Sequence, residues 1–171
     1  MNAANCFKVE FHTGDGNEIN IEAEIEGEYS QDLDLEVNTS GTTVLIEAGF
    51  APSFENPNDK LSAHKVVSIL LKLTIPSFKE VEVYGTNSRV ILEGKYKELD
   101  VSLSDGECEL HNIEGNANVK TQSGTINVFA RSAQINANSK YGIVSFNPIP
   151  EGLFIYKLQT VTGNIELSKT E

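Results

Sequence analysis

The sequence predicts an all-β protein whose C-terminal half is a parallel β-solenoid, a stack of similar coils. Three observations lead to this prediction. Along most of the chain, apolar and polar residues alternate with the period of two that is typical of β-strands. From position 81 onward, a similar 12-residue unit recurs, at first every 18 residues. Glycine recurs at one position of these units.

The first part of the chain, residues 7–75, alternates in the same way but keeps no strict period. Its strings of alternating residues are separated by turn-rich segments, and residues 49–60 hold two prolines and are predicted to form a loop. A long alternating string from Val67 to Ile75 ends at Pro76. We expect these residues to form irregular coils or antiparallel strands that cap one end of the stack, because an uncapped sheet edge invites aggregation.

The repeated units follow this cap. They read VEVYGTNSRVIL (81–92), LDVSLSDGECEL (99–110), ANVKTQSGTINV (117–128), INANSKYGIVSF (135–146) and YKLQTVTGNIEL (156–167). The fifth unit begins three residues late, after the proline-containing loop 147–152. Two short strands and two bends per unit suit one coil, since a unit this small buries its apolar face only against copies of itself. We therefore expect five coils, stacked in sequence order within residues 81–167. The alternative is a β-meander with evenly spaced hairpins, which seldom keeps the same residue types in the same positions over five units.

Aligned units show which residues should face inward. The first, third, tenth and twelfth columns are mostly apolar; the third reads Val83, Val101, Val119, Ala137, Leu158. The second column is polar and reads Glu82, Asp100, Asn118, Asn136, Lys157. This alternation predicts one buried and one solvent-facing side for each strand. The eighth column reads Ser88, Gly106, Gly124, Gly142, Gly163. We interpret its glycines as bend residues that need a positive φ.

Composition narrows the classes of function. The chain has 171 residues, a size that fits one domain, and a formal net charge of −12. Such a charge argues against a nucleic-acid partner and against docking on an anionic membrane surface. No stretch is apolar enough to insert in a membrane as a helix, and a soluble chain is expected. The first residues, MNAANCFKVEF, lack the basic and apolar regions of a signal peptide, so the chain as written is expected to be cytoplasmic, and its natural localisation is left open.

The order of these features resembles a known family. The passage KLTIPSFKEVEVYGTNSRVIL, followed by LSDGECEL, TQSGTINV and TVTGNIEL, is similar to the bacterial putative adhesin domains, which include the putative auto-transporter adhesin head domain. The resemblance covers residues 7–167. It implies a single-stranded, right-handed β-helix of a kind found in exported or cell-envelope proteins. It brings no catalytic, cofactor or metal-binding residues to this chain.

Candidate residues for chemistry are few. His12, His64 and His111 are isolated in sequence and form no metal or catalytic motif. Cys108 falls in an apolar column and is expected to be a buried, inert thiol, whereas Cys6 is expected near a fraying terminus and open to oxidation. The turn-rich segment HTGDGNEINI (12–21) holds several oxygen donors but does not match a calcium loop, so a turn between strands is expected there.

A pair of acidic residues raises the possibility of an enzyme. Glu82 and Asp100 should be neighbours on the outward side. A retaining glycosidase also requires its two carboxyls to lie about 5–5.5 Å apart and one of them to have a raised pKa. Two acids on a wet surface more often only repel each other. No enzyme, cofactor or metal is therefore predicted, and a carbohydrate-active enzyme is the least favoured hypothesis.

The outward face of the repeats is the remaining candidate. A flat polar face of regularly spaced side chains can bind an extended glycan or a protein, and the candidate residues on it are Tyr84, Lys120, Asn136 and Asn138. Three tyrosines in the repeats are candidates for exposed aromatic residues: Tyr84, Tyr96 and Tyr141. The sequence thus predicts a non-enzymatic, adhesin-like binding module. The alternative, suggested by the missing export signal, is an intracellular scaffold or regulatory partner linked to envelope stress.

Overall fold

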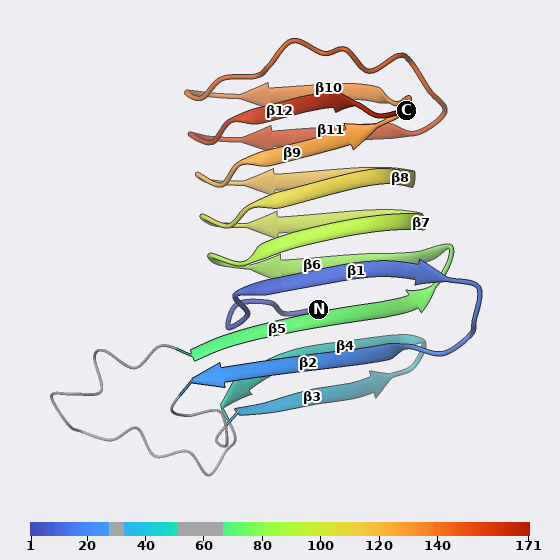
Figure 1. The fold of residues 1–171 in the computed structure, drawn as a ribbon, viewed down its shortest axis with the longest axis vertical. Coiled ribbons are helices and arrows are strands. Elements are labelled where there is room, and N and C mark those ends of the chain that lie inside the picture. Colours follow the sequence, from blue (N-terminus) through green and yellow to red (C-terminus); the bar gives the residue numbers. More distant parts are fainter. Residues whose placement is uncertain (28–32, 51–66) are drawn as a thin grey trace, which may run out of the picture.

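The structure is a computed structural model that describes residues 1–27, 33–50 and 67–171 (Figure 1). The described residues form strands, turns and loops but no helix, so the prediction of an all-β chain is confirmed. The strands are β1 (Lys8–Gly14), β2 (Asn20–Gly27), β3 (Leu33–Ser40), β4 (Thr43–Phe50), β5 (Val67–Pro76), β6 (Lys79–Gly85), β7 (Arg89–Leu103), β8 (Cys108–Thr121), β9 (Ile126–Ala130), β10 (Gln134–Ser139), β11 (Ile155–Thr160) and β12 (Ile165–Lys169).

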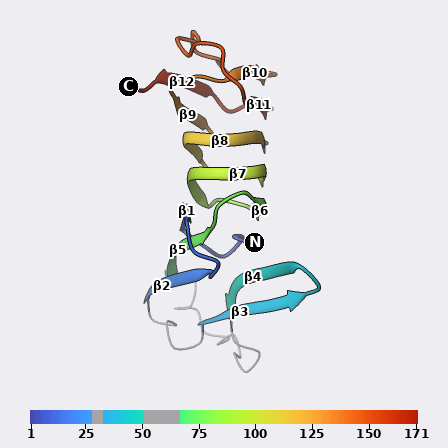
Figure 2. The ribbon, with the colours of Figure 1, turned by 90° about the vertical axis from the view of Figure 1, so that its right-hand side faces the viewer.

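Ten of these strands belong to one sheet that bends into two layers, and β3 and β4 form a separate hairpin (Figures 1 and 2). One layer, called the front layer here although it lies farther from the viewer in Figure 1, contains β6, the second halves of β7 and β8, then β11 and β10. The back layer contains β5, β1, the first halves of β7 and β8, then β9 and β12. Figure 2 shows β7 and β8 crossing from one layer to the other.

The first three repeated units lie side by side in parallel, with partners 18 residues apart. In the front layer Leu99 lies between Val81 and Ala117, and in the back layer Cys108 lies between Val90 and Ile126. The apolar columns meet in a core between the layers, where Val101, Val119 and Ile126 are almost wholly buried. The polar columns point away from this core, as the alternation requires.

The order of the last two units differs from the expected sequence order. The fifth unit lies between the third and the fourth, because β11 pairs with β8 on one side and β10 on the other. Its Tyr156 and Leu158 are fully buried, whereas Ile135 and Ala137 of the fourth unit are only half-buried at the end of the stack. The larger apolar side chains thus take the inner place, where they lose more contact with water.

The fourth unit also departs from its predicted burial. Phe146, expected in the core, is 87% exposed, and Val144 makes only an isolated bridge to Ile165. Among the described residues no strand pairs with the outer side of β10, and the second string of this unit runs into the loop 147–152 instead of forming a strand. From that loop Ile149 turns inward and is buried.

The recurring glycines serve a different purpose from the one predicted. None of Gly106, Gly124, Gly142 or Gly163 has a positive φ; that conformation occurs instead at Gly41, Gly94 and Gly115. The column glycines are required because neighbouring bends touch through their backbones. A Cβ on Gly124 would lie 1.6 Å from the carbonyl oxygen of Gly106, and one on Gly163 would lie 2.1 Å from that of Gly124.

The N-terminal residues form the less regular end of the stack. β1 is parallel to both β5 and β7, whereas β2 is antiparallel to β5, and β3 is antiparallel to β4. Asn2 bridges the hairpin and the front layer through Glu47 and Tyr84. Of the predicted loop 49–60, Gly49 and Phe50 belong to β4, and the rest lies outside the described residues.

Candidate functional site

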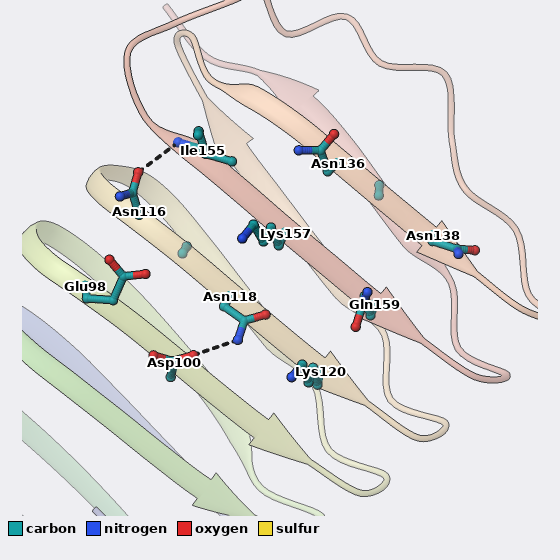
Figure 3. A pocket seen from close by; sticks show the side chains of 12 residues that line it. Glu98, Asp100, Asn116, Asn118, Lys120, Asn136, Asn138, Ile155, Lys157 and Gln159 are labelled. Atoms are coloured by element: carbon teal, nitrogen blue, oxygen red, sulfur yellow. Dashed lines mark hydrogen bonds between the residues drawn. The ribbon is translucent and has the colours of Figure 1, made fainter.

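A polar groove lies on the outward side of the front layer, across β7, β8, β11 and β10 (Figure 3). It encloses about 680 Å³, a volume within the range of ligand sites. Its lining residues are Glu98, Asp100, Asn116, Ala117, Asn118, Lys120, Asn136, Ala137, Asn138, Ile155, Lys157 and Gln159.

Parallel register places the polar side chains of the groove in two rows across the strands. One row runs Asp100, Asn118, Lys157, Asn136, and the next runs Ser102, Lys120, Gln159, Asn138. Within each row, adjacent residues come from adjacent strands, about 4.8 Å apart. The inward residues between the rows, Val101, Val119 and Leu158, are buried and anchor these strands to the core.

Two hydrogen bonds join residues drawn in Figure 3. The Asn118 Nδ2 group donates to Asp100 Oδ1 at 2.7 Å, and the backbone N–H of Ile155 donates to Asn116 Oδ1 at 3.1 Å. Both fix amides at the side of the groove nearest β7. The figure shows no such bond for Lys120, Asn136 or Asn138, whose polar groups are left to meet solvent or a ligand.

Three of the four candidate residues lie together in the groove: Lys120, Asn136 and Asn138. Tyr84 does not line it, but it shares the row of Ser102 and Lys120 and is 54% exposed. Its hydroxyl donates to Glu82 Oε2 at 2.9 Å, and this bond raises the pKa of Tyr84. Of the other aromatic candidates, Tyr141 is exposed, whereas Tyr96 is buried, with its hydroxyl 3.1 Å from the Glu93 carbonyl.

Lys157 is a groove residue that the sequence analysis missed. It was expected at the far end of the stack, but the inserted fifth unit places it between Asn118 and Asn136. The signal was present in the second column, where lysine stands among acids and amides, but its neighbours depended on the order of the coils.

The acidic pair proposed from the sequence is brought together at the β6 side of this face. Glu82 lies directly opposite Asp100 on neighbouring strands. Each carboxylate accepts a hydrogen bond from a surface neighbour, Glu82 from Tyr84 and Asp100 from Asn118.

A second polar cluster lies on the back layer. Glu109, only 7% exposed, accepts from Arg89 Nε at 2.7 Å and lies 3.1 Å from His111 Nε2. Burial acts to raise the pKa of Glu109, but the bonds with His111 and Arg89 outweigh it and hold this pKa below its usual range. His111 also stacks on Phe129. His12 lies 3.5 Å from Glu93, and His64 lies outside the described residues.

The two cysteines are both buried and unpaired, which corrects the expectation of an open Cys6. Burial raises the pKa of Cys6 to about 11 and raises that of Cys108 further. At pH 8 we expect roughly a hundredfold less Cys6 thiolate than for a free thiol. The thiols of the folded protein should therefore react slowly with a disulfide reagent. Both thiols should react fully only in denaturant. Rapid reaction of one thiol in the folded protein would contradict this prediction.

Neither a metal cluster nor a membrane-spanning helix occurs in the part of the chain that the structure describes. In residues 1–27, 33–50 and 67–171, no three His, Cys, Asp or Glu side chains are grouped to hold a metal ion. The segment 15–19 is a turn and bend between β1 and β2. The same ranges contain no helix with the length and apolar character needed to span a membrane.

Comparison with known proteins gives a likeness of fold. No protein-family model matches the sequence, and no curated protein matches it. A solved structure, that of a putative cell adhesion protein from Clostridium sporogenes, is similar with a TM-score of 0.61 over 98% of this chain and 94% of that chain. The two sequences are 12% identical, so the comparison supports an adhesin-like fold.

Proposed function

We propose that this chain is a non-enzymatic binding module of the adhesin type, built as a β-solenoid. The observation that carries the proposal is the polar groove, where side chains from four neighbouring strands stand in register on one outward face. The parallel 18-residue register of the first three units supports the solenoid architecture.

The chemistry of the groove favours binding over catalysis. Its exposed groups are mainly amides and lysines, and an amide offers paired donors and acceptors but no proton to transfer at neutral pH. The acidic residue nearest its centre, Asp100, already accepts from Asn118. Such a surface suits an extended polar ligand such as a glycan. The cell adhesion description of the similar structure agrees with this proposal.

A glycan array with the purified chain tests the proposal. We expect saturable binding that Asn136→Ala weakens about threefold to tenfold, the effect of losing one or two hydrogen bonds. Tyr84→Ala tests whether the face extends beyond the groove toward β6. Glu166→Ala provides the control, because Glu166 is exposed on β12 in the back layer.

Two results would contradict this proposal. One is binding that falls equally in Glu166→Ala and Asn136→Ala, which would place the ligand elsewhere. The other is an array without any bound glycan, after which a protein partner would be sought by pull-down from cell extract. Release of shortened saccharide would instead indicate an enzyme.

A further inference from the structure

Charge is distributed unevenly along the stack. Residues 1–50 hold eleven Asp and Glu and one Lys, whereas residues 111–171 hold four Glu and five Lys and Arg. The described residues of the first group, 1–27 and 33–50, belong to the end formed by β1 to β4, and the second group belongs to the end formed by β8 to β12 (Figure 1). The groove residues on β8, β10 and β11 therefore belong to the part of the molecule that is nearly neutral, whereas β7 contributes the acidic residues Glu98 and Asp100.

Three lysines surround the groove at this end. Lys120 and Lys157 line it, and Lys120 and Lys140 line an adjoining hollow of about 340 Å³ together with Asn138 and Gln159. Among the described residues no carboxylate lies within ion-pair distance of these three lysines, whereas Lys8, Lys95 and Lys97 each pair with a glutamate. The groove carboxylates, Glu98 and Asp100, lie on β7, which is next to the strand of Lys120 and is separated by β8 from the strand of Lys157.

We propose that the groove binds an acidic saccharide chain, with a carboxylate of the chain at Lys120 and Lys157. This inference rests on the proposed binding function and specifies its ligand. The hydroxyls of the sugar rings meet the amides of Asn118, Asn136 and Asn138, each of which can donate and accept. The spacing of successive strands is comparable to the length of one sugar unit, so the chain runs across the strands.

The shape of the surface favours a saccharide over an acidic peptide. A peptide usually binds a sheet through an unpaired edge or anchors a large apolar side chain in a pocket. The groove lies on the face of paired strands, and its exposed lining is polar except for the half-buried Ala137 and Ile155. Glu98 and Asp100 repel anions at the β7 side, which directs the carboxylate of the ligand toward the lysines on β8 and β11.

Calorimetric titration with oligomannuronate and its fully methyl-esterified form tests this inference, because the two chains share the same sugar backbone and the methyl ester removes the charge of each carboxyl. We expect the acid to bind about tenfold more tightly, the effect of one charge-assisted hydrogen bond. Added salt should weaken the binding of the acid but leave the binding of the ester unchanged. Lys157→Gln should reduce the advantage of the acid over the ester about threefold to tenfold, because the affinity for the acid falls more than the affinity for the ester.

Lys169→Gln provides the matched control, since Lys169 is exposed on β12 in the back layer, and it should change neither affinity. Circular dichroism of each variant verifies that it is folded. Equal binding of acid and ester, with no effect of Lys157→Gln, would overturn the proposal of an acidic ligand. The proposed binding function would still stand. Tight binding of poly-L-glutamate would overturn the saccharide class. Failure of both saccharides, and of every neutral glycan on the array, would overturn the proposed function as well.

Discussion

Replacing Val119 with aspartate is expected to unfold the repeated part of the chain. Val119 has no exposed surface and lies between Val101 and Leu158 in the core. A carboxylate there would be buried without a partner, which costs about 3–5 kcal/mol. A domain has only about 5–15 kcal/mol of stability in total, so this change removes much of it. Urea denaturation followed by circular dichroism measures the loss.

Lys120→Asp is the matched control, because it introduces the same residue one position further along β8. Lys120 is exposed and lies next to Ser102 and Gln159. The expected cost is at most about 1 kcal/mol, the range of strand propensities. Equal losses in the two variants would show that the alternation of inward and outward residues in β8 is wrong. Asn118→Asp is a poorer control, since it would set a second carboxylate against Asp100.

Gly124→Ala is expected to be nearly as damaging, although it adds only a methyl group. The new Cβ would lie 1.6 Å from the carbonyl oxygen of Gly106. This neighbour is backbone, so no rotation of a side chain relieves the overlap, and the stacked bends must move apart. Overpacking usually costs 1–3 kcal/mol, and we expect a loss of about 3 kcal/mol or more. Denaturation in urea, with the wild type alongside, gives the value.

Gly16→Ala is the companion variant. Gly16 lies in the turn between β1 and β2, and the nearest atom to its added Cβ is 4.0 Å away. Alanine at an unstrained position restricts the unfolded chain, so we expect no loss or a gain of about 0.4–1 kcal/mol. The contact between bends would be refuted by a Gly124→Ala protein as stable as the Gly16→Ala protein.

Much of the fold could be predicted because alternation is a local property of the sequence. Whether Val119 faces inward depends on its own strand, and this follows from its apolar neighbours two residues away. The order of the coils is not local. Units 135–146 and 156–167 share the same columns, so the pattern did not distinguish them. Their order depends on which unit buries more apolar surface when it lies between two others. The loop 147–152 is long enough to allow either order.

The glycine column shows a correct residue with a wrong explanation. A bend can require glycine because of its own φ or because another chain touches it, and both causes leave the same letter in the sequence. Only the contact between Gly106 and Gly124 distinguishes them. The candidate site followed the same rule. The outward side of Asn136 and Asn138 follows from their own strand, whereas the place of Lys157 depends on which repeated unit lies beside it.

The uneven charge of the stack bears on how fast an anion could reach the groove. The net charge of the whole chain, −12, implies that the protein repels an approaching anion. The order β10-β11-β8-β7-β1-β5-β2 separates its ends by six strand spacings, roughly 29 Å. The Debye length at physiological ionic strength is about 8 Å, so ions screen the acidic end several times over before its field reaches β10. An anion that approaches the β10 end therefore meets little repulsion from the acidic end, although the chain as a whole is strongly negative.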